Sequence, residues 1–148
     1  MACALRLFTT LMNVDAEVSI YPLTETYLEH PVHDFTDILK RHGCAVENGP
    51  LSLLAKGELP AVFEALRPGG LYGVVDHTRR HMEPDSAANV RRVDPVAAIE
   101  ETLRAGFEFV DYSDLHYRPG DDLSLEVGDE RVSGRTDRFT LLFRKPQE

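Results

Sequence analysis

The sequence has few cysteines, no glycine before Gly43 and no long apolar run. Each of these shortages excludes some classes of protein or site. The two cysteines, Cys3 and Cys44, have no zinc-type spacing and are expected to be reduced thiols. The apolar stretch at the start is short and is interrupted by Arg6. Nothing approaches the ~20 apolar residues of a membrane span. These features predict a cytoplasmic protein without a membrane segment.

Basic residues are also in short supply, with 16 Lys and Arg against 25 Asp and Glu. The formal net charge of −9 argues against nucleic acid or an anionic membrane as a partner. A local basic cluster is interpreted as a solvated loop rather than an anion site; it comprises Arg79, Arg80, Arg91 and Arg92. Hydrophobic residues make up 43% of the 148, which suits a single globular domain over residues 1–148.

Apolar spacing predicts the elements of the first half. A short strand is expected over residues 17–21, and a helix should follow Asp34, which can cap it, and end before Gly43. Residues 44–57 are predicted to be a loop, and residues 59–66 a second helix.

The second half carries the clearest signals. Residues 71–76 are nearly continuously apolar, which is typical of a central strand in a parallel sheet. After a long polar loop, Asp94 and Pro95 begin a helix whose buried stripe is expected to be Val96, Ile99 and Leu103. Strands are predicted over residues 107–112 and 138–145. This order predicts an α/β fold, mostly parallel, closing with an antiparallel hairpin.

Several motifs carry a family resemblance. The turn Pro68-Gly69-Gly70 before an apolar strand resembles the link from the fourth helix to the fifth strand of class I S-adenosylmethionine-dependent methyltransferases. The resemblance implies a Rossmann-like methyltransferase sheet. Within that fold the chain is similar to the bacterial predicted methyltransferases with a VDH motif after the fifth strand, a likeness carried by Val75-Asp76-His77, Arg92-Val93-Asp94, Asp121-Asp122 and the segment from Gly134 to Phe139. The likeness covers roughly residues 59–146 well and residues 17–58 loosely.

The N-terminal half departs from that family. Its members place a glycine-rich turn after the first strand, where backbone N–H groups approach the cofactor. Here no two glycines before Gly69 have that spacing. The sequence therefore predicts a single methyltransferase-like domain that lacks the N-terminal glycine-loop unit, as a truncated or diverged form or as one completed by a partner.

Four residues are candidate catalytic groups. His33 and Asp34 are expected at the carboxyl end of one strand, and Asp76 and His77 follow the carboxyl end of another, the edge where ligands bind in open α/β sheets. A histidine there could act as general base toward an acceptor. The alternatives are that Asp34 is only a helix cap, His33 a loop residue and Asp76 a turn residue. The spacing of the remaining histidines does not favour a metal site.

The resemblance implies transfer of a methyl group from S-adenosylmethionine to a small-molecule acceptor. The missing glycine loop leaves a second interpretation open, a non-catalytic methyltransferase-like subunit that needs a partner or a second copy. A third is a small unrelated α/β binding module.

Overall fold

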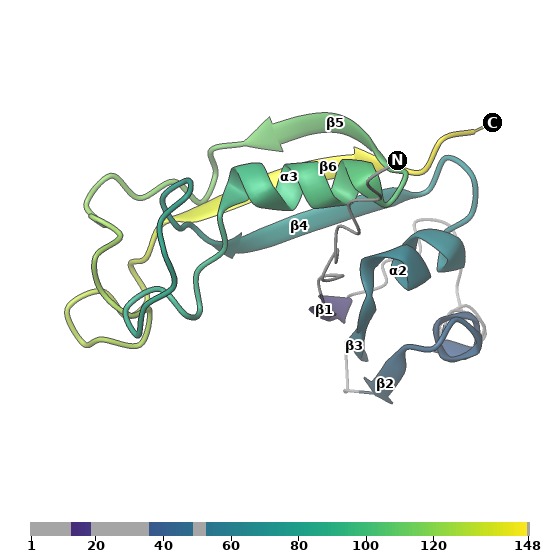
Figure 1. Cartoon of the computed structure of the whole chain (residues 1–148), viewed down its shortest axis with the longest axis horizontal. Coiled ribbons are helices and arrows are strands. Elements are labelled where there is room, and N and C mark those ends of the chain that lie inside the picture. Colours follow the sequence, from purple (N-terminus) through teal and green to yellow (C-terminus); the bar gives the residue numbers. More distant parts are fainter. Residues whose placement is uncertain (1–12, 19–35, 49–52, 148) are drawn as a thin grey trace, which may run out of the picture. The chain divides into compact units, whose positions relative to one another are not determined.

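The computed structural model describes residues 13–18, 36–48 and 53–147 (Figure 1). The chain divides into two compact units, Met1–Ala65 and Leu66–Glu148. In each unit the described strands form a three-stranded antiparallel sheet. The expected mostly parallel, Rossmann-like sheet is therefore wrong: within the described residues the one parallel pairing is an isolated bridge between Thr78 and Val93.

The first unit contains β1 (Asn13–Val18), β2 (Ala45–Asn48) and β3 (Leu53–Glu58), in the order β1-β3-β2. Residues 36–41 are helical, and Gly43 follows with a φ of 88°, as the sequence predicted. Helix α2 (Leu59–Ala65) is also as predicted. The predicted loop over residues 44–57 is wrong, because most of it forms β2 and β3. Leu39, Cys44 and Ala65 make the small buried core.

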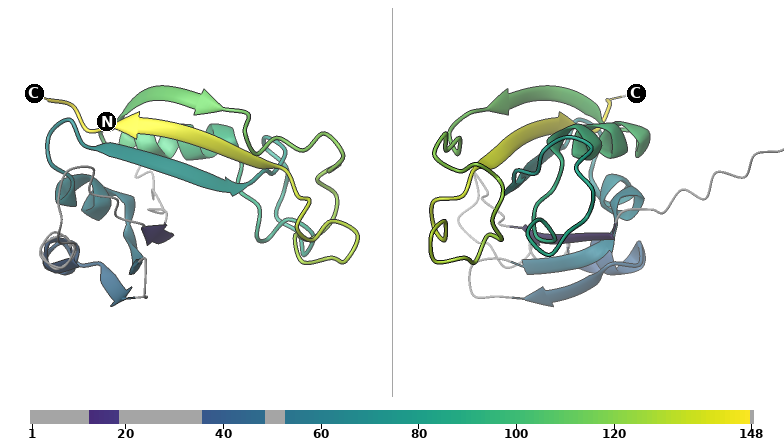
Figure 2. Two further views of the ribbon diagram at one scale, coloured as in Figure 1. Left: turned by 180° about the vertical axis from the view of Figure 1, so that it is seen from behind. Right: turned by 60° about the vertical axis from the view of Figure 1, so that its left-hand side comes forward.

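The second unit has the strand order β4-β6-β5, with β4 (Leu71–His77), β5 (Glu108–Ser113) and β6 (Arg138–Arg144). The last strand of the chain is thus the middle strand of the sheet. Helix α3 (Pro95–Arg104) lies over one face of it (Figure 1). Seen from behind, the opposite face carries no helix of this unit (Figure 2, left).

Aromatic contacts fix the covered face. Tyr72 stacks on Phe107 with ring centroids 5.1 Å apart, and Phe109 meets Phe143 edge-on at 5.6 Å. Phe143 is fully buried. Because strand residues alternate between faces, Leu71 and Val75 of β4 belong to the opposite face, called the open face below. Leu71 is 60% exposed and Val75 is 50% exposed. The apolar run of β4 was predicted to be covered on both faces, but one side remains open.

Helix α3 begins where its sequence predicted. Asp94 accepts hydrogen bonds from the backbone N–H groups of Val96 and Ala97, and Pro95 is the first helical residue. The predicted buried stripe is shifted around the helix. Its buried residues are Ala98 and Thr102, whereas Val96 and Leu103 are about half exposed.

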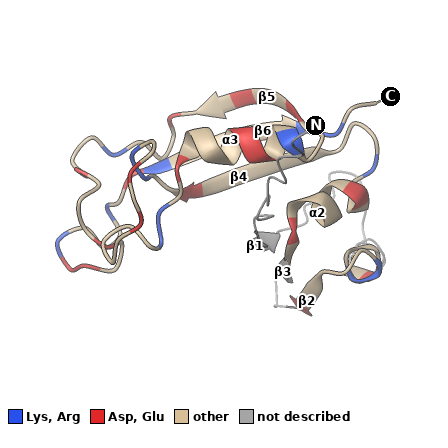
Figure 3. Cartoon of the chain, viewed as in Figure 1, with Lys and Arg blue, Asp and Glu red and all other residues tan. Residues whose placement is uncertain are grey.

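Two long loops meet at one end of the second sheet, at the left of Figure 1. One runs from β4 to α3, and the other joins β5 to β6. Acidic and basic residues alternate along both (Figure 3). Because β4 ends and β6 begins at this end, the loops bring together residues that are far apart in the sequence.

Candidate acid–base site at the end of strand β4

Asp76 and His77 are the last two residues of β4. In the antiparallel register Asp76 lies opposite Phe139, and His77 lies opposite Arg138. Since successive strand residues point to opposite faces, Asp76 belongs to the face that α3 covers and His77 to the open face. The backbone N–H of His77 donates to Asp76 Oδ1 at 2.6 Å. The predicted pair is thus adjacent at a strand end, although its two side chains diverge.

A buried hydroxyl orients His77. Thr136 Oγ1 lies 2.8 Å from His77 Nδ1, and Thr136 is only 6% exposed. Among the residues that the structure describes, His77 Nε2 has no hydrogen-bond partner. The hydroxyl can accept a hydrogen bond from Nδ1 or donate one to it, so the contact fits both neutral tautomers. With the proton on Nδ1, the tautomer we adopt, the Nε2 lone pair is available as a base.

The environment moves the pKa values of the two side chains toward each other. Burial raises the pKa of the Asp76 carboxyl despite the hydrogen bond from His77 and the nearby charges. Burial, followed by the positive charge of Arg138, lowers the pKa of His77. His77 is therefore a neutral imidazole at neutral pH, the form that can accept a proton.

A buried ion pair joins the two loops behind this strand end. The Arg92 guanidinium donates to both carboxylate oxygens of Asp121, at 2.9 and 3.2 Å, and both side chains are fully buried. Arg92 also donates to the carbonyl oxygens of Thr78 and Leu125. Such a bidentate pair holds both loops in one geometry.

The same carboxylate reaches the start of β6. Asp121 Oδ2 accepts the backbone N–H of Asp137 at 2.7 Å, and Asp137 Oδ1 accepts the backbone N–H of Arg118 at 2.7 Å. Thr136, which contacts His77, directly precedes Asp137. Burial alone would raise the pKa of Asp121, but the hydrogen bonds from Arg92 and the backbone lower it overall. The ion pair thus supports the backbone that carries the partner of His77.

These contacts correct one sequence interpretation. Arg92 was expected to belong to a solvated loop, yet it is buried. Asp137 acts as a cap for the backbone at Arg118, and within the described residues it forms no ion pair with Arg138. The sequence could not show the Arg92–Asp121 pair, because its members are 29 positions apart.

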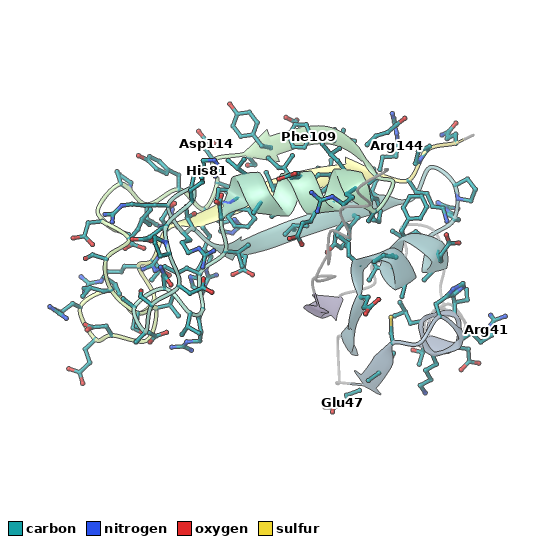
Figure 4. The ribbon with its side chains drawn as sticks, viewed as in Figure 1. Arg41, Glu47, His81, Phe109, Asp114 and Arg144 are labelled. Atoms are coloured by element: carbon teal, nitrogen blue, oxygen red, sulfur yellow. The ribbon has the colours of Figure 1, made fainter. Side chains whose placement is uncertain are left out.

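A second histidine contact lies at the start of α3. His81 Nδ1 is 2.8 Å from Asp94 Oδ2, and the same oxygen accepts the backbone N–H of Met82 at 3.0 Å. Met82 has a φ of 58°, which is unusual for a residue other than glycine. Figure 4 labels His81 at the loop end of the unit and Arg144 at the opposite end of the sheet. The sequence identified Asp94 as a helix cap but missed its contact with His81.

His33 and Asp34, the other two predicted site residues, lie outside the described residues. Within the described ranges no group of three His, Cys, Asp or Glu side chains could hold a metal ion. In the same ranges no helix is long and apolar enough to cross a membrane. Thr136 was missed as a contact of His77; its position in the Gly134–Phe139 motif was the available signal.

The described glycines of the second unit do not form a cofactor loop. Gly69 has a φ of 74°, and a Cβ atom on Gly70 would lie 2.8 Å from the carbonyl oxygen of Arg67. Both glycines are therefore explained by the tight turn before β4. In the described part of the chain we find no residues that fit the role of the missing cofactor loop.

Comparison with known proteins yields one distant similarity. No protein-family model matches the sequence, and no curated protein matches it. Among solved structures, the [4+2]-cyclase SpnF is similar with a TM-score of 0.43 and 19% sequence identity. The match covers 61% of this chain and 43% of the SpnF chain. A similarity at this level carries no functional argument.

Proposed function

We propose that the chain takes part in S-adenosylmethionine-dependent methyl transfer to a small-molecule acceptor, with residues 66–148 forming the acceptor side. One observation carries the proposal: the segments that hold the family resemblance meet at the carboxyl end of β4. His77 contacts Thr136, while Arg92, Asp121 and the backbone of Asp137 form one buried network beside it. The segments that contain these residues are spread over more than half of the second unit. Closeness in the sequence therefore does not explain why they meet.

The proposed role of His77 is to remove a proton from the acceptor. S-adenosylmethionine, when bound, supplies an electrophilic methyl group, and only some acceptors need a base before they can attack it. Thr136 holds the imidazole in the tautomer that leaves Nε2 unprotonated. Asp76 remains close enough to stabilise the imidazolium that forms, since its charge favours the protonated histidine.

Calorimetric titration of the full chain with S-adenosylmethionine tests the proposal. We expect saturable heat, and competition by S-adenosylhomocysteine. The variant His77→Gln should retain cofactor binding while losing methyl transfer to acceptors that need deprotonation. An absence of heat at millimolar cofactor, with folded protein, contradicts autonomous methyl transfer by this chain.

A second candidate is a non-catalytic methyltransferase-like subunit. The open face of the second sheet favours it, since Leu71 and Val75 are each at least 50% exposed. Exposed apolar side chains on one sheet face are typical of surfaces that a partner covers. Light scattering separates the candidates: a dimer that does not bind S-adenosylmethionine supports the subunit, and a cofactor-binding monomer contradicts it.

A further inference from the structure

Arg138 stands out among the arginines of the second unit because its guanidinium group is unengaged. In this unit, whose described part is residues 66–147, two arginines make no side-chain hydrogen bond or ion pair, Arg67 and Arg138. The others all donate to carboxylates or carbonyl oxygens: Arg79, Arg80, Arg91, Arg92, Arg104, Arg118, Arg131, Arg135 and Arg144. In a chain with a net charge of −9, an arginine left without an acidic partner requires an explanation.

The position of Arg138 supplies one. It is the first residue of β6 and lies directly opposite His77 in the antiparallel register. Side chains of residues opposite each other in such a pair share one face of the sheet, with Cβ atoms about 5 Å apart. Arg138 is exposed. Its charge lowers the pKa of both Asp76 and His77, which places the guanidinium group close to the acid–base pair. In Figure 3 basic colour marks the start of β6 beside the acidic end of β4.

The surroundings of Arg138 suit a small organic anion. The next pair on the same face consists of Val75 and Thr140. Thr140 Oγ1 lies 2.9 Å from His116 Nδ1, and Val75 is half exposed. Asp76 is the nearest acidic residue along β4, and it belongs to the opposite face. The open face therefore combines an unengaged guanidinium, two imidazoles and an apolar side chain; its carboxylates come from β5, where Glu108 lies opposite Arg144 and Asp111 opposite Leu142.

We propose that Arg138 binds an anionic group, carboxylate or phosphate, of the acceptor and so places the acceptor nucleophile beside His77. Binding of an anion at this place is independent of the proposed function. Only the identification of that anion as the methyl acceptor rests on the proposed function. A guanidinium recognises both groups through paired N–H donors. Because the whole chain repels anions, binding should depend on this one local charge.

The test is an NMR titration of the full chain with acetate, and separately with inorganic phosphate, at constant ionic strength and without cofactor. We expect saturable shifts of the His77 imidazole and Arg138 Nε signals. In Arg138→Gln the dissociation constant should rise about tenfold or more, which corresponds to loss of a charged hydrogen bond. Arg138→Lys should bind with intermediate affinity. Saturation by acetate alone indicates a carboxylate acceptor, and saturation by phosphate alone indicates a phosphorylated one.

Arg67→Gln is the matched control, because it removes the other unengaged arginine of this unit and should leave the shifts unchanged. Circular dichroism verifies that each variant is folded. Absence of saturable shifts in the wild type, or unchanged binding by folded Arg138→Gln, overturns the proposal. If the anion binds but S-adenosylmethionine does not, methyl transfer by this chain is contradicted while the anion site stands.

Discussion

At the scale of single residues, the contact with one buried hydroxyl bears on which nitrogen of His77 carries the proton. Thr136 Oγ1 is 2.8 Å from Nδ1, and no described residue forms a hydrogen bond with Nε2. A base must present an unprotonated nitrogen to its substrate, so the tautomer matters as much as the pKa. Burial and Arg138 keep the pKa of His77 below its usual 6.5. Hydroxyl and arginine thus act on one side chain in different ways, the first on its tautomer and the second on its charge.

Replacing Thr136 with valine should switch that tautomer. Thr136→Val removes the acceptor for Nδ1–H, so the neutral imidazole should shift toward the Nε2–H form that free histidine favours. Nitrogen-15 NMR of His77 above its pKa measures the change. The lost partner should also cost about 1–3 kcal/mol of stability, since the hydroxyl is buried.

Thr140→Val is the control for this prediction, because Thr140 makes the corresponding contact with His116 Nδ1 at 2.9 Å. It should alter the signals of His116 and leave those of His77 in place. An unchanged His77 tautomer in folded Thr136→Val contradicts the assigned proton position, and with it the role of Nε2 as the base.

At the scale of elements, Asp94 joins α3 to the loop that precedes it. One carboxylate oxygen caps the helix through Val96 and Ala97, and the other accepts from Met82 N–H and contacts His81. Burial alone would raise the pKa of Asp94, but these hydrogen bonds lower it overall. The strained backbone at Met82, with its φ of 58°, is thereby tied to the helix start.

We expect Asp94→Ala to destabilise the chain by about 1–2 kcal/mol, the upper part of the range for a lost helix cap. The loss of stability should exceed that caused by removing an ordinary helix cap, because the backbone N–H of Met82 also loses its acceptor. Urea denaturation followed by circular dichroism measures it. Asp94→Asn keeps an oxygen acceptor and should lose less than Asp94→Ala; equal losses contradict the double role.

Local signals explain why α3 could be predicted and the sheets could not. Asp94, Pro95 and Gly106 mark the ends of the helix within thirteen consecutive residues, and Gly106 has the expected positive φ of 106°. Strand pairing, in contrast, depends on distant partners. The apolar run of β4 fits a doubly covered parallel strand and a half-open antiparallel strand equally well. The sequence placed Asp76 and His77 at a strand end, but not the neighbours that act on them.

The Arg92–Asp121 pair is the element-scale contact with the largest expected effect. Asp121→Asn leaves a buried guanidinium without its counter-charge, which costs about 3–5 kcal/mol in comparable sites. The change should also weaken the start of β6, where Asp137 N–H donates to the same carboxylate. Urea denaturation gives the loss. As a control, Glu126→Gln disrupts the exposed contact with Arg91 and should leave the urea midpoint of unfolding almost unchanged. Similar losses of stability in Asp121→Asn and Glu126→Gln contradict the special role of the buried pair.

At the scale of the whole molecule, the buried charges predict how stability depends on pH. Asp94 and Asp121 have folded pKa values below 3.8, so they stabilise the native state above that pH. Their contribution is lost as the pH falls through the folded values, because the unfolded chain takes up protons first. His77 acts in the same direction but earlier: its folded pKa lies below 6.5, so protons favour the unfolded state once the pH falls below 6.5. Asp76 acts in the opposite direction, since its raised pKa makes the native state bind its proton more tightly.

The free energy of unfolding should therefore decline in two stages as the pH falls, first below 6.5 and again below about 4. Urea denaturation at a series of pH values, followed by circular dichroism, measures both stages. His77→Gln should flatten the first stage and leave the second, because glutamine has no proton to gain. Asp121→Asn should weaken the second and leave the first. A first stage that survives in His77→Gln means that another group is responsible for it. The protein then does not contain the neutral, partly buried imidazole on which the acid–base site depends.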